Sequence, residues 1–214
     1  MIDSLTWHLS VWRFYGRSQH PGWHRQAANA AGLDVSTHEV RVPLLSGGCV
    51  VVAPSGDVEI STLRSRLIRE NITAIPAATG LFRVIAEEAP DIFANVQEAR
   101  TGGDLVSPAA VRRVQQACSS EVLRGMDNPT EITPFASNQE VFSAHSPVQA
   151  VAIGQALDHN QLHTLDEQVL PVADEEASEL CIAGAEVAWG YVGRPELVAD
   201  RYLAVRCCAV VGCA

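Results

Sequence analysis

Short apolar runs alternate with amphipathic stretches along most of the chain, beginning near residue 31. CVVVA at 49–53 is rich in β-branched residues and is followed by a proline and a glycine, which predicts a buried strand. ITAI at 72–75 and VQEAR at 96–100 predict two further strands. Because amphipathic segments separate these runs, the pattern predicts an α/β fold with a mostly parallel sheet and flanking helices.

Three amphipathic helices are predicted within this region, because apolar residues recur three or four positions apart. Their apolar faces hold Leu63, Leu67 and Ile68, then Leu81, Val84 and Ile85, and finally Val111, Val114 and Cys118. Ser61 or Thr62 is the expected cap of the first helix. The third has Ser107 as its expected cap and Pro108 at its first helical position.

The two ends of the chain differ from its centre. QLHTLD at 161–166 and ELCIAG at 179–184 alternate in polarity, which predicts a smaller, partly antiparallel region that follows a parallel core ending near 155. Residues 1–30 hold three of the four tryptophans and a single acidic residue, and they are expected to form a loosely packed leader. The expected domain therefore spans 31–203, and 204–214 is a separate tail.

Composition removes several classes of function. The formal net charge of -10 disfavours nucleic acid or an anionic membrane as partner, because both require a concentrated positive surface. No apolar run approaches the roughly 20 residues of a membrane span, so a globular, cytoplasmic protein is expected. All 15 basic residues are arginine, which excludes a Walker-type phosphate loop and a lysine Schiff base within this sequence.

Few residues indicate chemistry on their own. TGGD at 101–104 joins a predicted strand to a helix, where it is either an ordinary turn or a place where a nucleotide approaches bare backbone. His159 and His163 are four apart but lie in a predicted strand, about 13 Å from each other, which argues against a shared metal. The six cysteines form no paired CxxC motif and are expected to be reduced thiols. Asp34 is either a cap or a buried carboxylate that requires a cation.

Four segments, in order, resemble the adenylation domains of nonribosomal peptide synthetases, members of the adenylate-forming superfamily. LDVSTHEVRVPLLSGGCVVVAP is similar to the family stretch that begins Phe-Asp-x-Ser, and LFRVIAEEAPDIFANVQEARTGGDLVSPAAVRRV is similar to the stretch that follows it. GMDNPTEITPFAS resembles Asn-x-Tyr-Gly-Pro-Thr-Glu, and SELCIAGAEVAWGYVGRPELVADRY resembles Gly-Glu-Leu-x-Ile-x-Gly-x-Gly-Val-Ala-Arg-Gly-Tyr. The resemblance implies a ligase-type enzyme that activates an α-amino acid with ATP and Mg²⁺ and passes it to a carrier-protein domain.

The resemblance also implies site residues. Asp34 would bind the α-ammonium group of the substrate, and the remaining pocket positions would be Val35, His38, Pro76, Arg100, Gly102, Met126, Pro134 and Phe135. Thr130 would contact the α-phosphate and Glu131 would hold Mg²⁺. Nucleotide contacts are implied for Gly102, Gly103, Asp127 and Asn128. His38 and Arg100 indicate a polar or anionic substrate side chain, because a desolvated guanidinium requires an acceptor.

Departures from the family pattern leave three hypotheses open. Gly125, Asp127 and Asn128 stand where the family has Asn and Tyr-Gly, and Ser178, Glu186 and Trp189 replace Gly, Gly and Arg. The leader does not match the family's phosphate loop, and nothing in the tail matches its ribose-binding motif or catalytic lysine. The chain is therefore interpreted as a truncated relic of the domain in preference to a working enzyme completed by another chain. A binding module that retains only amino-acid or nucleotide contacts is the third hypothesis.

Overall fold

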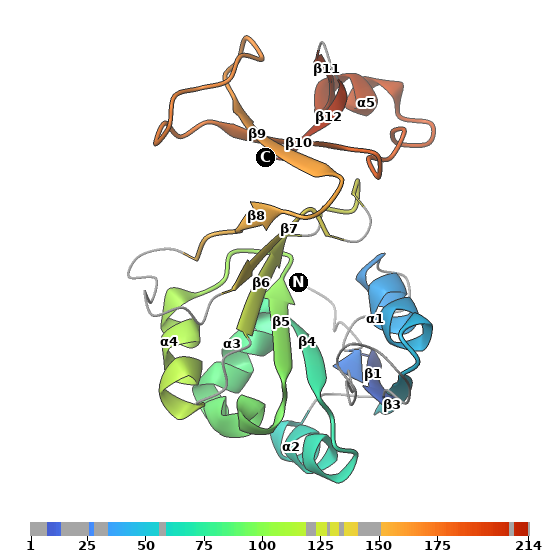
Figure 1. Ribbon diagram of the computed structural model, residues 1–214, viewed down its shortest axis with the longest axis vertical. Coiled ribbons are helices and arrows are strands. Elements are labelled where there is room, and N and C mark those ends of the chain that lie inside the picture. Colours follow the sequence, from blue (N-terminus) through green and yellow to red (C-terminus); the bar gives the residue numbers. More distant parts are fainter. Residues whose placement is uncertain are drawn as a thin grey trace, which may run out of the picture.

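The computed structural model describes residues 8–13, 26–27, 34–55, 59–118, 123–127, 129–132, 135–140, 151–205 and 208–213 of the 214-residue chain (Figure 1). A five-stranded sheet with the order β4-β5-β6-β7-β8 forms its centre. β4 (Ala74–Ala78), β5 (Glu98–Gly102) and β6 (Leu123–Asp127) are parallel, which confirms the predicted α/β fold. β7 (Ser137–Glu140) and β8 (Gln155–Ala156) are antiparallel, so the antiparallel region begins earlier than the sequence pattern predicts.

Helices cover one face of this sheet. α2 (Ile60–Arg69), α3 (Thr79–Glu88), the 3₁₀ helix η1 (Pro90–Asn95) and α4 (Pro108–Ala117) bury their apolar stripes in one cluster with the strands. Leu63, Leu67 and Val111 are almost completely buried there, as predicted. Ile68 and Val84 are instead 56% and 38% exposed, because the buried stripe of each helix is narrower than the apolar pattern.

The helix starts confirm one predicted cap and correct another. Ser107 caps α4, accepting a hydrogen bond from the backbone N–H of Ala110, with Pro108 in the first turn. The cap of α2 is Glu59 and not Ser61 or Thr62, because the helix already begins at Ile60. The Thr62 hydroxyl donates instead to the Glu59 carboxylate.

A second, smaller sheet lies beside β4, the edge strand of the main sheet (Figure 1). α1 (Asp34–Leu45), which the sequence pattern did not predict, precedes β3 (Cys49–Ser55). β3 pairs antiparallel with β1 (His8–Arg13), which also pairs with β2 (Gln26–Ala27). The expectation that 49–53 is a buried strand is wrong, since β3 lies outside the main sheet and Val52 is 67% exposed.

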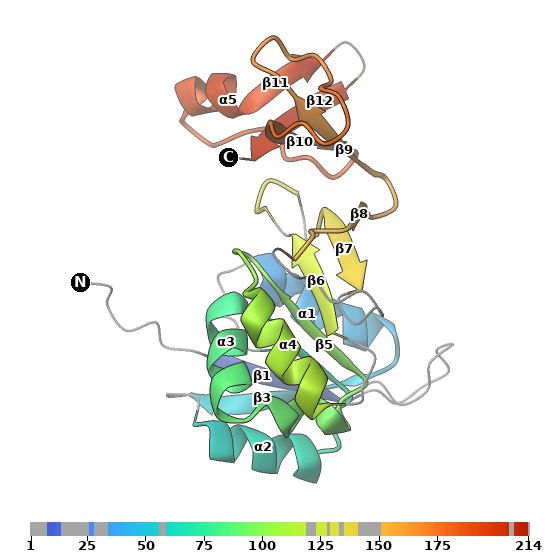
Figure 2. The same ribbon diagram turned by 90° about the vertical axis from the view of Figure 1, so that its left-hand side faces the viewer.

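A small antiparallel sheet sits beyond one end of the main sheet (Figures 1 and 2). It has the order β11-β12-β10-β9, and its strands are β9 (Asn160–Leu165), β10 (Glu179–Gly184), β11 (Tyr202–Val205) and β12 (Cys208–Cys213). α5 (Pro195–Arg201) leads into β11. The predicted antiparallel strands at 161–166 and 179–184 are confirmed. Among the described residues, no helix has the length and apolarity to cross a membrane.

Candidate active site

The two faces of the main sheet carry different side chains. One face packs against the helices and is called the core face, and the opposite face, which carries predicted pocket residues, is called the site face. Ile75, Ala77, Ala99 and Leu123 belong to the cluster under the helices. Residues one position away point to the opposite face, because side chains on a strand alternate. That face carries four of the predicted pocket residues: Pro76, Arg100, Gly102 and Met126. The strand register sets Pro76 beside Arg100 and Gly102 beside Met126, although the members of each pair are 24 residues apart in the chain.

Arg100 is the charged centre of this face. Its Nε donates to Oε1 of Glu98, two residues earlier on the same strand and 1% exposed. Its Nη1 lies 3.0 Å from Nε2 of His38 in α1. Because the protein itself supplies a buried carboxylate for the guanidinium, Arg100 does not require an anionic substrate group.

His38 links α1 to the segment that follows β6. Its ring is buried and packs edge-on against Phe135, with 4.7 Å between centroids and an interplanar angle of 80°. Phe135 is 7% exposed. The two aromatic rings and the guanidinium therefore come together from three separate segments, namely α1, β5 and the stretch after β6.

A cavity of about 420 Å³ opens where the parallel strands β5 and β6 end. Carboxyl ends of parallel strands form the usual ligand-binding edge of an α/β sheet. Two segments singled out in the sequence line this cavity, TGGD through Gly103 and Asp104 and GMDN through Gly125, Met126 and Asp127. Gly103 has a φ of 88°, a backbone conformation that glycine adopts at little cost.

Glu131 lies just beyond this edge and is tied to a distant segment. The hydroxyl of Tyr191 donates to its Oε1, and the N–H of Ala188 donates to its backbone carbonyl at 2.8 Å. The hydrogen bond to the Glu131 carboxylate raises the pKa of Tyr191 to about 12, with burial as a smaller cause, so the phenol is a proton donor at neutral pH. Thr130, the neighbouring residue, is exposed.

The oxygen ligands at this point fit Mg²⁺. A carboxylate and a hydroxyl are hard donors, and Mg²⁺ is usually held by one or two carboxylates together with substrate phosphates. Within the described part of the chain, no three His, Cys, Asp or Glu side chains form a metal-binding group. The carboxylate of Glu131 therefore suits a cation that arrives with a nucleotide, and the Thr130 hydroxyl suits a contact to a phosphate oxygen.

Four predicted residues are not part of the contacts described above. Asn128 and Pro134 lie outside the described residues. Asp34 is placed at the start of α1 without a description of its side chain, and Val35, the next residue of α1, is half-buried. Sequence reasoning in turn missed Tyr191 and Glu98. Tyr191 belongs to the last of the four family-like segments, and Glu98 is two positions from Arg100 on a predicted strand, which is the spacing that puts two side chains on one face.

Comparison with known proteins agrees with this fold. The family model described as AMP-binding enzyme matches residues 28–192, and the chain belongs to that family. Within the family, it is part of an adenylation domain of the nonribosomal peptide synthetase type.

Relatives and solved structures share this region at moderate identity. Bacitracin synthase 1 of Bacillus licheniformis is 28% identical over 172 residues, 80% of this chain and 3% of that protein. Nonribosomal peptide synthetase asaC of Aspergillus flavus is 28% identical over 183 residues, which cover 83% of this chain and 17% of that protein. The NpsA N-terminal subdomain of Klebsiella oxytoca, in complex with 3-hydroxyanthranilyl-AMSN, matches with a TM-score of 0.80 and 26% identity, covering 88% of this chain and 49% of its own. The chain thus spans about half of that subdomain and a small part of the curated relatives.

Proposed function

We propose that this chain forms the part of an enzyme that binds an amino acid and ATP. The complete enzyme would use the ATP to convert the amino acid into an aminoacyl-adenylate. One observation carries the proposal. The site face around Arg100 and the cavity at Gly103 share the carboxyl edge of β5, and Glu131 follows directly after β6. An acid and a nucleotide bound there would meet at their reacting ends.

The amino acid is assigned to the site face. Asp34 at the start of α1 would pair with its α-ammonium group, since a carboxylate and an ammonium compensate each other when both leave water. Pro76, His38 and Phe135 offer mainly apolar surface to the side chain. The charge balance between Arg100 and Glu98 favours a side chain that is uncharged and able to accept a hydrogen bond.

The nucleotide is assigned to the cavity at the strand ends. Bare backbone at Gly103 and Gly125 gives a planar base room to approach. Asp127, where the resemblance places a tyrosine, cannot stack on a base, so affinity for the nucleotide should be lower than an aromatic residue would give. Thr130 and Glu131 would face the phosphates, with Thr130 donating to an α-phosphate oxygen.

The reaction is a displacement at phosphorus. A carboxylate oxygen of the amino acid forms a bond to the α-phosphorus of ATP, the bond from that phosphorus to the bridging oxygen breaks, and pyrophosphate leaves. Mg²⁺, when bound, would neutralise the negative charge that gathers on the phosphates. The residues of the chain hold the two reactants in line and keep their reacting atoms close, which lowers the barrier through proximity.

The product is proposed to pass to a carrier-protein domain. The solved NpsA–ThdA protein, an artificially fused adenylation–PCP di-domain, matches this chain with a TM-score of 0.80 over 88% of its length. That match supports a carrier domain as the partner of the complete enzyme.

Binding of ligands to the 214-residue chain tests the proposal. Isothermal titration calorimetry with Mg·ATP and with each of the twenty common amino acids should reveal one preferred amino acid, with Asp34→Ala abolishing its binding. Losing one member of a buried ion pair costs about 3–5 kcal/mol, so a measurable affinity should disappear. The control is Asp174→Ala, an exposed carboxylate of the connection between β9 and β10. Unchanged amino-acid binding in Asp34→Ala would contradict the assigned site.

A further inference from the structure

We propose that Tyr191 is a positioning residue that holds Glu131 in the orientation needed to bind the Mg²⁺ of Mg·ATP. This inference rests on the proposed function, because it assumes a nucleotide in the cavity at Gly103 whose phosphates reach Glu131. Nothing in the sequence pattern assigns Tyr191 a role. A set of contacts joins the segment around Tyr191 to Glu131, although the two are far apart in the sequence.

The contacts involve both the side chain and the backbone of Glu131. The Tyr191 hydroxyl donates to Oε1 of the carboxylate, across 60 positions of sequence. The N–H of Ala188 donates to the Glu131 carbonyl at 2.8 Å, and an isolated antiparallel bridge joins Ile132 to Val187. The backbone contacts fix the position of Glu131, and the phenol fixes the rotation of its carboxylate.

Local geometry directs Tyr191 inward while its neighbours face the solvent. Trp189 and Val192 are fully exposed, whereas Val187, earlier in the segment, packs against the buried cluster that contains Ile132. Gly190 has a φ of 134°, and a Cβ at that position would lie 2.8 Å from Cγ2 of Val198 in α5. Glycine is therefore required for the turn that delivers Tyr191 to Glu131.

A second tyrosine supports the ring without sharing its function. The rings of Tyr191 and Tyr202 pack edge-on, with centroids 5.7 Å apart and an interplanar angle of 82°. The Tyr202 hydroxyl is buried and has no hydrogen-bond partner among the described residues. Tyr202→Phe removes a phenol hydroxyl next to Tyr191 but leaves the hydrogen bond from Tyr191 to Glu131 intact. It is therefore the matched control for Tyr191→Phe.

A hydrogen bond to one carboxylate oxygen suits metal binding by the other. Carboxylates that ligate a metal are commonly held by hydrogen bonds from outside the ligand shell, and loss of such a partner typically lowers metal affinity about 10–100-fold. Tyr191 occupies Oε1 of Glu131 and leaves Oε2 for the cation. The phenol therefore selects the carboxylate rotation in which Oε2 is presented to a bound nucleotide.

The test compares ATP affinity with Mg²⁺ and with EDTA in the 214-residue chain. We expect Tyr191→Phe to lose about 10–100-fold of the affinity for Mg·ATP and to keep the wild-type affinity for metal-free ATP. Tyr202→Phe should match the wild type in both. Glu131→Gln should lose the Mg²⁺-dependent part, and adding Tyr191→Phe to it should change nothing more, because Tyr191 acts through Glu131. Gly190→Ala, which keeps the phenol but displaces it, should show the same selective loss.

The outcomes separate the inference from the proposed function. If Glu131→Gln loses the Mg²⁺-dependent affinity while Tyr191→Phe keeps it, the positioning role is overturned and the proposed function stands. An equal loss of affinity for Mg·ATP and metal-free ATP in Tyr191→Phe would show a merely structural role and also overturn the inference. If the wild-type chain binds ATP equally well with and without Mg²⁺, the assignment of Glu131 fails and both proposals fall. Melting temperatures of all variants identify any general loss of folding.

Discussion

Gly102 lies so close to the neighbouring strand β6 that there is no room for a side chain at this position. A Cβ at this position would lie 1.8 Å from the backbone oxygen of Met126 on the neighbouring strand. The glycine of the TGGD segment is therefore needed for strand pairing, in addition to any contact with a ligand. Its requirement for glycine comes from the approach of β6, which the sequence motif does not show.

Gly102→Ala should consequently destabilise the protein. Forcing a methyl group into this contact moves the backbone of β5 or β6, and overpacking of this kind typically costs about 1–3 kcal/mol. Gly80→Ala is the control, because nothing lies within 4 Å of the Cβ that it would add. In urea unfolding, Gly102→Ala should lose stability while Gly80→Ala should keep or gain it. Equal stability of the two variants would contradict the close approach of the strands.

Among the helices, α4 has a defined start that a single hydroxyl supports. Ser107 accepts from the Ala110 N–H at 3.4 Å, which is long for a hydrogen bond. Ser107→Ala should therefore lower the free energy of unfolding by about 0.5–1 kcal/mol, toward the lower end for an N-cap. Ser61→Ala is the control, since Ser61 lies inside α2 and does not cap it. Chemical denaturation should give a loss only for Ser107→Ala, and a larger loss for Ser61→Ala would favour the cap that the sequence pattern predicts for α2.

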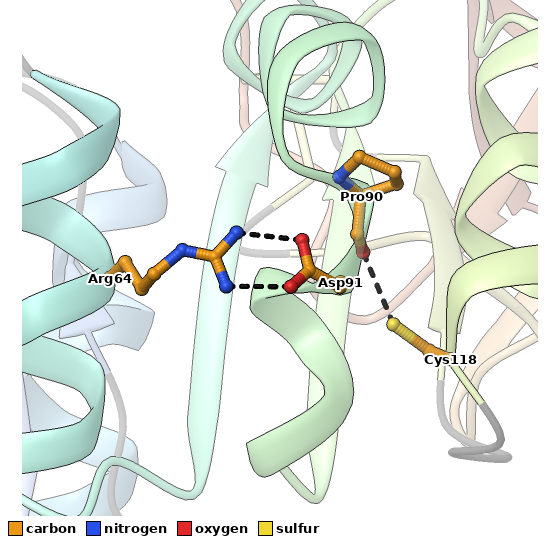
Figure 3. A network of polar contacts seen from close by, with 4 residues as sticks. All are labelled: Arg64, Pro90, Asp91 and Cys118. Atoms are coloured by element: carbon orange, nitrogen blue, oxygen red, sulfur yellow. Dashed lines mark hydrogen bonds and ion pairs between the residues drawn. The ribbon is translucent and has the colours of Figure 1, made fainter.

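An ion pair joins α2 to η1 at the protein surface. Arg64 donates to both oxygens of Asp91 at 2.6 Å, and the thiol of Cys118 donates to the carbonyl of Pro90, the residue before Asp91 (Figure 3). The hydrogen bond from Arg64 lowers the pKa of Asp91. Burial raises the pKa of the Cys118 thiol, so it remains protonated at neutral pH.

The lowered pKa of Asp91 gives the ion pair a defined pH dependence. A carboxyl group whose pKa falls on folding stabilises the fold above its ordinary value of about 3.8, and this stabilisation is lost as the pH falls through the lowered folded value. The stability difference between wild type and Arg64→Met should thus be present at neutral pH, vanish in strong acid and shrink with added salt. Arg66→Met, on the same helix, is the charge-matched control. A difference that is independent of pH would point to packing of the arginine stem.

At the scale of the whole molecule, we expect the 214-residue chain to bind its ligands without catalysing adenylate formation. The 214 residues include no lysine, and the resemblance implies a catalytic lysine that meets the developing charge. Loss of one such donor typically costs about 10²–10³ in rate. The chain alone should therefore give no amino-acid-dependent exchange of pyrophosphate into ATP above background. A clear exchange signal for one amino acid that disappears in Glu131→Ala would contradict this prediction and favour a functioning enzyme over a relic.

The sequence by itself determined the alternation of strands and helices, the antiparallel pair near the C-terminal end, the Ser107 cap and the family. These features depend on local periodicity or on short motifs, which are present in the linear order of residues. Local pattern did not distinguish a half-buried antiparallel β3 from a fully buried strand of the parallel sheet, because β-branched residues suit both. It also did not predict α1.

Only the tertiary structure decided how the site is assembled. Arg100 received Glu98 and His38 as partners, and Glu131 received Tyr191, through strand register and through a contact across 60 positions of sequence. A charged side chain in a sequence has no partner until the fold selects one. The sequence indicated a polar or anionic substrate side chain opposite Arg100, whereas the structure shows a guanidinium already balanced by a buried carboxylate. The difference arises because Coulomb energies depend on distances in space and not on positions in the chain.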